Sequence, residues 1–411
     1  MRNVMIFVLI AVWILTGCTP AEEFGAVASE SGNRSDAFIK GADVSSLISL
    51  ENSGAVFYGF DGQPQDVLKT LHEAGMNYIR VRIWNDPYDA QGNGYGGGNC
   101  DLENAILLGQ RAVQYGMKLM ADFHYSDFWA DPSKQQAPKA WADMDLAEKE
   151  QAIYDYTVAS LKSIRDAGVD VGMVQIGNET NNGFCGEFNA SGQYRLMAAA
   201  ARAVRDTDSG ILIAVHYTNP EAGNYGVYAA DLEAYGVDYD VFATSYYPYW
   251  HGTLENLTEQ LQLVIESYGK KVLIAETAWA YTAADGDGHP NSVSEQPAPE
   301  RCPFTVEGQT AALASVISAM ERFGENGLGV FYWEPAWIAV PGNSWAERAE
   351  KWQAYGSGWA SSYAGEYDPD DAGVYFGGSS WDNQALFDFN GYPLESMRVF
   401  TGDCTGTEEK P

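Results

Sequence analysis

Two glutamates stand directly after apolar segments, where a charged side chain is costly to keep. Glu179 follows Val-Gln-Ile-Gly-Asn and Glu276 follows Val-Leu-Ile-Ala. Two carboxyl groups in one cavity can share proton donation and nucleophilic attack, because unlike surroundings keep one protonated and the other ionised. If the two carboxyl groups are about 5 to 5.5 Å apart, one carboxylate can attack the substrate directly. A separation of about 6.5 to 9.5 Å leaves room for a water molecule that attacks instead. The alternative is a structural ion pair with Arg80 or Arg82.

Other polar side chains collect in the same way at the ends of neighbouring apolar segments. These residues are Arg80, Arg82, Asp122, His124, Asn178, His216, Ser245, Tyr246, Tyr247 and Glu334. A fold that brings all the segment ends to one face would gather these side chains around one cavity. The question is therefore whether the strands and helices of the chain form a fold that brings these segment ends together.

Short apolar segments alternate with longer segments of helical periodicity from residue 38 onward, which is typical of parallel βαβ units. The expected strands are 38–44, 78–84, 118–124, 172–177, 211–216, 241–246, 271–277 and 329–333. Helix signals lie between them: Asp61 and Pro64 open a helix that ends at Gly75, and Asp101 opens one that ends at Gly116.

The strand and helix pattern predicts an α/β fold, a single (β/α)₈ TIM barrel. In such a barrel, the carboxyl ends of all strands and their polar residues open on one face. A doubly wound sheet is the alternative. No GxGxxG follows the first strand, which argues against a dinucleotide site.

The charge and aromatic content limit the partners. The 411 residues include 24 Lys and Arg against 56 Asp and Glu, a formal net charge of −32, which repels nucleic acid and anionic lipid headgroups. Aromatic residues make up 13% of the chain, with 12 Trp and 25 Tyr, which excludes a disordered chain. We expect a neutral ligand and no nucleic acid partner.

The N-terminus predicts export. Residues 4–15 are an unbroken apolar run behind Arg2, too short to span a bilayer and typical of a signal peptide. The sequence Leu-Thr-Gly-Cys ending at Cys18 resembles a bacterial lipoprotein signal, which implies a lipid anchor on Cys18 in a bacterial membrane. An ordinary secretory signal is the alternative. We expect a signal peptide at 1–17, a flexible tether at 18–36, a catalytic domain at 37–404 and a tail at 405–411.

Four further cysteines are expected to form disulfides, since an exported chain meets an oxidising compartment. Three pairings are open, and we favour Cys100 with Cys185 and Cys302 with Cys404. Metal binding by these thiols does not fit their spacing.

Six segments together carry a resemblance to a known family. They are 80–87 (RVRIWNDP), 122–131 (DFHYSDFWAD), 177–180 (GNET), 245–249 (SYYPY), 275–277 (AET) and 331–337 (FYWEPAW). Asn178-Glu179 after the fourth strand, with Glu276 after the seventh, resembles the retaining glycoside hydrolases on (β/α)₈ barrels. More narrowly, the segments resemble the endo-β-1,4-galactanases of glycoside hydrolase family 53, over about residues 40 to 400.

The resemblance implies cleavage of β-1,4-galactan, the type I arabinogalactan of pectin, with retention of configuration. Glu179 would be the general acid/base and Glu276 the nucleophile. Asn178 would bind the sugar 2-hydroxyl, and Arg80 would keep Glu276 ionised, a bidentate role that Lys cannot copy. A tyrosine after the sixth strand would support the nucleophile, and Tyr247 is favoured over Tyr246.

The aromatic excess suits sugar binding, because the apolar face of a pyranose packs on flat rings. Trp333 would form the floor of the central subsite, and His124 and His216 would line the cleft, although a histidine at a strand end is as often structural. The candidates for outer subsites are Trp84, Trp129, Trp250, Trp279, Trp337, Trp352 and Trp359.

The loop after the seventh strand has the pattern of a hard-cation site. Its polar side chains alternate with other residues at Asp285, Asp287, His289 and Asn291. The EF-hand pattern is incomplete. The resemblance implies one structural calcium ion, with Ser379 and Asp382 completing the site and tying together two loops. An ordinary polar loop is the alternative.

Two other functions stay open. A related retaining enzyme would act on β-mannan or β-xylan, and a lipoprotein without activity would use the barrel only to bind glycans. The presence of both Glu179 and Glu276 argues against the second. We expect a monomer that works outside the cytoplasm, at the cell surface or in the periplasm.

Overall fold

The computed structural model describes residues 38–298 and 301–402. The predicted signal peptide, the lipidation site Cys18, the tether, Cys404 and the tail lie outside these residues. None of the helices that the structure describes has the length and apolar content needed to cross a lipid bilayer.

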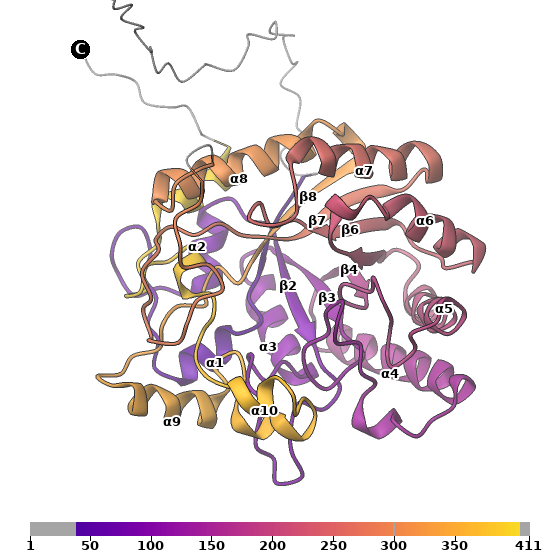
Figure 1. Cartoon of the computed structure of the whole chain (residues 1–411), viewed down its shortest axis with the longest axis horizontal. Coiled ribbons are helices and arrows are strands. Elements are labelled where there is room, and N and C mark those ends of the chain that lie inside the picture. The colour runs from indigo at the N-terminus through magenta and orange to yellow at the C-terminus, as the bar shows by residue number, and fades with distance from the viewer. Residues whose placement is uncertain (1–37, 299–300, 403–411) are drawn as a thin grey trace, which may run out of the picture. The chain divides into compact units, whose positions relative to one another are not determined.

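Eight parallel strands close into a barrel in chain order, which confirms the predicted (β/α)₈ fold (Figure 1). The strands are β1 (Ile39–Asp43), β2 (Tyr78–Ile83), β3 (Lys118–Phe123), β4 (Val171–Ile176), β5 (Leu212–Tyr217), β6 (Val241–Ser245), β7 (Lys271–Thr277) and β8 (Gly327–Trp333). Asp43 pairs in register with Trp333 where β8 returns to β1. Closure leaves no sheet edge to be covered.

Helices follow the strands and cover the outside of the barrel (Figure 1). They are α1 (Leu47–Asn52), α2 (Val67–Glu73), α3 (Leu102–Val113), α4 (Leu146–Asp166), α5 (Ala190–Thr207), α6 (Tyr225–Ala234), α7 (Leu254–Tyr268), α8 (Val306–Glu321), α9 (Trp345–Tyr355) and α10 (Ala372–Tyr375). Short 3₁₀ turns occupy Lys139–Trp141, Pro220–Ala222, Gly324–Asn326, Ser362–Glu366, Asp382–Gln384 and Glu395–Thr401.

Helix starts follow the capping side chains. Asp101 caps α3 by accepting a hydrogen bond from the Asn104 amide, as predicted. The predicted start at Asp61 is wrong, since Asp61 instead accepts from the amide of Gln63 in a turn. Asp66 is the cap of α2, because its side chain accepts from the backbone of the second helical residue.

The barrel interior is apolar toward the amino ends of the strands, here called the lower end, and charged toward their carboxyl ends, the upper end. The apolar layer consists of Ile39, Met120, Met173, Ala214, Val241, Ala243, Leu273, Ala275 and Phe331. Gly41 is required there, since a Cβ atom would lie 2.1 Å from the Phe331 ring. Side chains two residues further along a strand share its inner face, so Asp122 follows Met120 and Gln175 follows Met173 toward the upper end. This polar layer is the floor of the site.

The predicted disulfide between Cys100 and Cys185 is wrong, because both are buried free thiols. Cys100 packs in a cluster with Trp84 and contacts the Gly97 carbonyl oxygen at 3.1 Å, whereas Cys185 belongs to the main core. Separate packing keeps the two sulfurs apart, and burial raises the pKa of each thiol to about 12. Cys302 is also free.

Candidate active site

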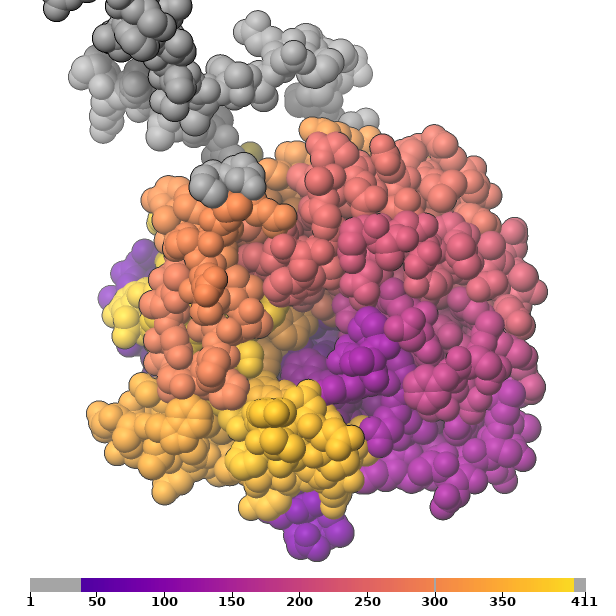
Figure 2. All heavy atoms as spheres, in the orientation of Figure 1, coloured from indigo at the N-terminus to yellow at the C-terminus, as the bar shows by residue number. Residues whose placement is uncertain are grey.

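A cleft of about 430 Å³ opens at the carboxyl ends of the strands, and both predicted catalytic residues, Glu179 and Glu276, line it. The space-filling view in Figure 2 shows a hollow near the centre of the face drawn in Figure 1. The cleft lies on the face where (β/α)₈ barrels carry their active sites. Two carboxyl groups almost a hundred residues apart in the chain therefore share one cavity.

Glu276, the last residue but one of β7, lies among partners suited to a carboxylate. Arg80 Nη2 lies 2.9 Å from Glu276 Oε1, and the Tyr247 hydroxyl donates to Glu276 Oε2 over 2.9 Å. Arg80 is fully buried and also pairs with Asp43 at 2.7 Å and Asp122 at 2.8 Å. This guanidinium is held in place by carboxylates on three strands.

Tyr247, rather than Tyr246, contacts the predicted nucleophile. The Tyr246 hydroxyl donates instead to the Gly252 carbonyl oxygen at 3.2 Å. A hydrogen bond and an ion pair on its two oxygens hold the Glu276 carboxylate in one orientation, which is what a nucleophile needs.

Glu179 has weaker support for a negative charge. It is half-buried, and one oxygen accepts a hydrogen bond from Ser245 Oγ at 2.6 Å. Its φ of 45° is a left-handed conformation that few residues other than glycine adopt. Burial first, and then the charge of Glu276, raise the pKa of Glu179 to about 8.

The surroundings of the two glutamates divide the roles of acid and base. The pKa of Glu276 is raised overall, because burial outweighs the charge of Arg80 and the Tyr247 hydrogen bond, which both lower it. Since only Glu276 touches a cation, it ionises first and its charge keeps the proton on Glu179. The arrangement suits Glu179 as proton donor and Glu276 as nucleophile.

Asn178 and His124 border the cleft, whereas His216 does not reach it. Asn178 Oδ1 accepts from Arg80 Nη2 at 2.8 Å, and its Nδ2 donates to the Ala130 carbonyl oxygen at 2.8 Å. His124 Nε2 lies 3.0 Å from Asp122. The fully buried His216 instead supports Asn178 Oδ1 at 2.9 Å from beneath, and burial lowers its pKa well below 6.5.

Of the tryptophans predicted to bind substrate, some line the cleft and the others are buried in the core. Trp333 and Trp359 line the cleft, together with Trp129, Trp250 and Trp337. The structure does not bring Trp279 or Trp352 there, since both are buried and neither is among the residues that line the cleft. Trp279 stacks on Tyr249 at 4.5 Å, and Trp352 packs on Trp345 at 4.9 Å. Trp84 is likewise buried. Large apolar rings at strand ends fill the core as readily as a binding site.

Several cleft residues escaped prediction. Arg82 was placed among the strand-end residues but given no role in binding, and Trp381 was not singled out, yet both line the cleft. A binding role for Arg82 could have been predicted from its spacing, because it is two residues after Arg80 on one strand. Trp381 sits in an irregular segment and packs against Trp333 at 4.7 Å and Tyr247 at 5.5 Å. No local pattern marks that contact.

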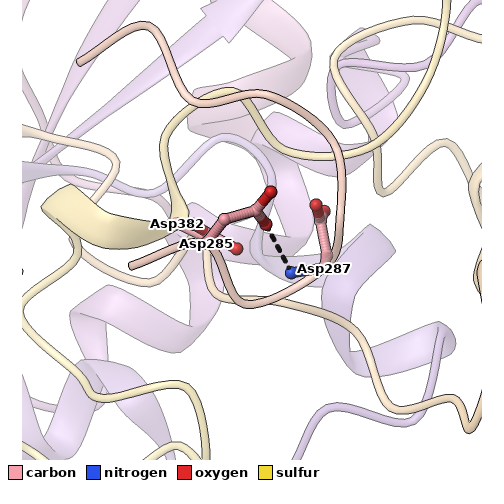
Figure 3. A group of neighbouring side chains, drawn as sticks. All are labelled: Asp285, Asp287 and Asp382. Carbon is pink, nitrogen blue, oxygen red and sulfur yellow. Dashed lines mark hydrogen bonds between the residues drawn. The ribbon is translucent and has the colours of Figure 1, made fainter. Parts of the chain in front are cut away.

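Three of the predicted metal ligands converge outside the cleft. Asp285, Asp287 and Asp382, here called the aspartate triad, place one carboxylate oxygen each within 4.8 Å of one another (Figure 3). Asp285 Oδ1 accepts from the Asp287 amide at 3.0 Å, which curls the loop around the site. Backbone amides of Ser379 and Gly286 donate to Asp287 and Asp382, so the triad joins the segments after β7 and β8.

The other predicted ligands lie around the triad in different ways. Asn291 Nδ2 donates to Asp382 at 2.7 Å, and the buried Asn291 Oδ1 has no hydrogen-bond partner. The His289 ring packs toward Trp345, with ring centres 6.2 Å apart. Ser379 Oγ accepts from the Trp381 amide at 3.1 Å. Trp381 lines the cleft and directly precedes Asp382, so the triad lies next to the cleft wall.

Comparisons with known proteins agree with this geometry. The sequence model of "Glycosyl hydrolase family 53" matches residues 39–400. The chain is 57% identical over 365 residues to the "Endo-beta-1,4-galactanase" of Bacillus subtilis (strain 168), covering 88% of this chain and 85% of the relative. It is 33% identical over 329 residues to the "Arabinogalactan endo-beta-1,4-galactanase" of Cellvibrio japonicus (strain Ueda107), covering 77% and 85%.

A solved structure has the same architecture. The "Ignisphaera aggregans GH53 catalytic domain" superposes with a TM-score of 0.78 at 38% identity, covering 89% of this chain and 95% of that chain.

Proposed function

Because the chain belongs to glycosyl hydrolase family 53, we propose that it cleaves internal bonds of β-1,4-galactan, the type I arabinogalactan of pectin, with retention of configuration. One observation carries the chemistry: Glu179 and Glu276 line one cleft, and only Glu276 is paired with a buried cation. Named galactanases among the relatives support the choice of substrate.

The reaction proceeds in two displacements. The Glu276 carboxylate attacks the anomeric carbon while Glu179 gives its proton to the departing glycosidic oxygen, so that a covalent glycosyl ester forms. Glu179, now ionised, then takes a proton from water, and the water oxygen displaces Glu276 from the anomeric carbon. Two inversions return the β configuration.

The buried partners prepare both steps. Arg80 and Tyr247 hold the two oxygens of Glu276, so the carboxylate loses little further freedom when it attacks. Asn178, whose amide is fixed by Arg80 and the Ala130 carbonyl oxygen, offers a polar group for the sugar 2-hydroxyl. Such contacts help most when they strengthen toward the transition state. Trp333 supplies an apolar surface for the sugar ring.

Product analysis on purified galactan, mannan and xylan tests the activity. We expect galacto-oligosaccharides from galactan and no release from the other two polymers. Release of oligosaccharides from mannan or xylan alone would show that the substrate is that polymer and not galactan. Binding of a polymer without any release of oligosaccharides would favour a glycan-binding protein. An NMR time course tests the stereochemistry, because retention releases the β-anomer first and an α-anomer would exclude Glu276 as nucleophile.

The aspartate triad is proposed to hold one structural calcium ion. Burial raises the pKa of Asp287 to about 6 and, together with the charge of Asp287, that of Asp382 to about 7. The unpartnered Asn291 Oδ1 adds an oxygen of the type that calcium prefers. The ion supplies positive charge that lets the three carboxylates ionise together. Asn291, Ser379 and His289 are proposed to complete the site.

Export and a lipid anchor on Cys18 in a bacterial membrane are proposed from the N-terminal sequence. Metabolic labelling with a fatty acid tests the anchor, since Cys18→Ala should abolish labelling and release the protein from membranes. Label that persists in Cys18→Ala would exclude this site. A monomer in solution is proposed as well, and light scattering of the protein without its signal peptide checks it.

A further inference from the structure

A third glutamate at the top of the barrel, Glu334, has no part in the two displacement steps. It directly follows β8 and is fully buried, and its φ of 51° is a left-handed conformation that residues other than glycine rarely adopt. A buried carboxylate in such a conformation persists only where its surroundings hold it. Its partners therefore indicate what it does.

Both carboxylate oxygens of Glu334 are engaged inside the protein. Oε1 pairs with Arg82 Nη2 at 2.7 Å, and Oε2 accepts from Ser46 Oγ at 2.6 Å. The Ser46 amide adds a bond to Oε1 at 3.3 Å. Glu334 is not among the residues that line the cleft. It therefore cannot act as a third catalytic acid and must act through a neighbour.

That neighbour, Arg82, does line the cleft. Its guanidinium carbon lies 4.5 Å from the centre of the Trp129 ring and 5.6 Å from that of Trp333. Arg82 Nη2 also donates to the Gly97 carbonyl oxygen at 3.1 Å, and Nη1 lies 3.3 Å from Asp43. Arginine is well suited to this place, because its flat cation can stack on aromatic faces while its edge makes hydrogen bonds.

We propose that Glu334 is a positioning residue that holds Arg82 against Trp129 and Trp333 and thereby fixes the aromatic wall on which the sugar chain binds. The nature of the ligand rests on the proposed function. The Ser46 hydroxyl holds the carboxylate oxygen of Glu334 that Arg82 does not contact, so the order of support runs from Ser46 through Glu334 and Arg82 to the two indoles.

A purely structural ion pair would affect folding, whereas a positioning residue changes ligand binding in the folded protein. Glu334→Gln keeps the size of the side chain and removes its charge. We expect the Kd for β-1,4-galactotetraose, measured by titration calorimetry in a Glu179→Gln background, to rise about tenfold, as expected for a weakened cation–π contact. With Glu179 intact, KM should rise by a similar factor and kcat should change less than about twofold.

Glu51→Gln is the matched control, because Glu51 pairs with Arg111 through two bonds of 2.8 Å and does not line the cleft. It should leave the Kd unchanged. Ser46→Ala removes the support of Glu334 but no charge, and should raise the Kd by a smaller factor. If Glu334→Gln does not fold, Ser46→Ala decides the matter, and an unchanged Kd there overturns the proposal.

Near-ultraviolet circular dichroism separates this inference from the proposed function, since it reports on the indoles without a substrate. Glu334→Gln should alter the tryptophan bands while the far-ultraviolet spectrum stays the same. An unchanged Kd together with unchanged tryptophan bands would overturn the inference. A wild-type protein that neither binds nor cleaves galactan would overturn the proposed function alone, and the tryptophan bands would still test the role of Glu334.

Discussion

Around Arg80 and Arg82, four carboxylates are packed beside two guanidinium groups, whereas the aspartate triad has no such cation. The first group, here called the barrel-top cluster, contains Asp43, Asp122, Glu276 and Glu334. Among the ion pairs of the described residues, no Lys, Arg or His joins a triad carboxylate. The negative charge of the two acidic clusters is therefore compensated in different ways.

The electrostatic consequences are opposite for Asp122 of the barrel-top cluster and Asp382 of the triad, although burial also raises the pKa of Glu276 and, to about 7, that of Glu334. Burial raises the pKa of Asp122, but Arg80 and His124 outweigh it, so that the pKa is lowered overall. Burial of Asp382 meets no such opposition, and its pKa rises to about 7. The counter-charges of the barrel-top cluster are side chains in direct contact with its carboxylates. Near the triad, Arg348 donates to the backbone carbonyl oxygen of Asp287 at 3.3 Å rather than to its carboxylate, and the cation that the triad is proposed to bind would come from solution. Each prediction below tests one side of this contrast.

The largest effect is expected at the nucleophile. Glu276→Ala should lower kcat by about 10⁴-fold, because no other group can form the covalent ester. Glu179→Ala should also lose most activity, since the leaving group lacks its acid. On an activated aryl β-galacto-oligosaccharide, sodium azide should give the β-azide with Glu179→Ala and the α-azide with Glu276→Ala. Products of the reverse configuration would exchange the two roles.

The next effect is expected at Arg80. Arg80→Lys places one ammonium among three carboxylates that the guanidinium fork contacts together, so kcat/KM should fall about 10²-fold and unfolding should require about 3 kcal/mol less. Arg111→Lys is the control, since Arg111 pairs with Glu51 and Asp66 near the surface and should change stability by less than about 1 kcal/mol. Equal losses in urea melts of both variants would contradict the special place of Arg80.

Removing the proposed calcium should affect stability more than chemistry. A chelator is expected to lower Tm by roughly 5 °C, because a ligand at a hundred times its Kd contributes about 2.7 kcal/mol. Asp382→Asn should melt at the same temperature with and without the chelator. If wild-type Tm does not respond to chelator and added calcium, the triad is not a calcium site.

The chelator effect should also depend on pH. The pKa values of Asp287 and Asp382 are raised in the folded state, so the folded chain without metal binds more protons and loses stability as pH rises from about 4 to about 7. The proposed calcium ion would bind the ionised carboxylates and oppose this loss of stability. The Tm difference between loaded and chelated protein should therefore widen over that range. A constant difference would mean that Asp287 and Asp382 do not titrate there.

The smallest predicted effect is in the pH profile of activity. Glu179 must hold a proton for the first step, so kcat/KM should fall about tenfold per pH unit once pH exceeds about 8. The negative charge of Glu276 raises the pKa of Glu179, so Glu276→Gln should lower that pKa. The same substitution removes turnover, and kinetics therefore cannot report the change. The Glu179 titration in that variant is therefore followed by carbon-13 NMR. A pKa that does not fall would show that Glu276 does not hold the proton on Glu179.

Much of the site could be predicted, because a parallel barrel places every strand end on one face. The periodicity of the strands was enough to bring Glu179, Glu276, Asn178 and Arg80 together. The failures have a common cause. Trp279 follows a strand, Cys100 and Cys185 lie in loops and Trp352 lies in α9, and only three-dimensional packing decides whether such a side chain turns inward or toward the cleft.

The sequence by itself determined the repeat of strands and helices, the acids at the strand ends and the alternating aspartates, since these follow from periodicity and residue type. Tertiary structure alone decided which acid meets a cation, which tryptophans face the ligand, and that Glu334 reaches Arg82 rather than the catalytic pair. The reason is physical: pKa values and ring contacts depend on distances of a few ångströms between residues far apart in the chain.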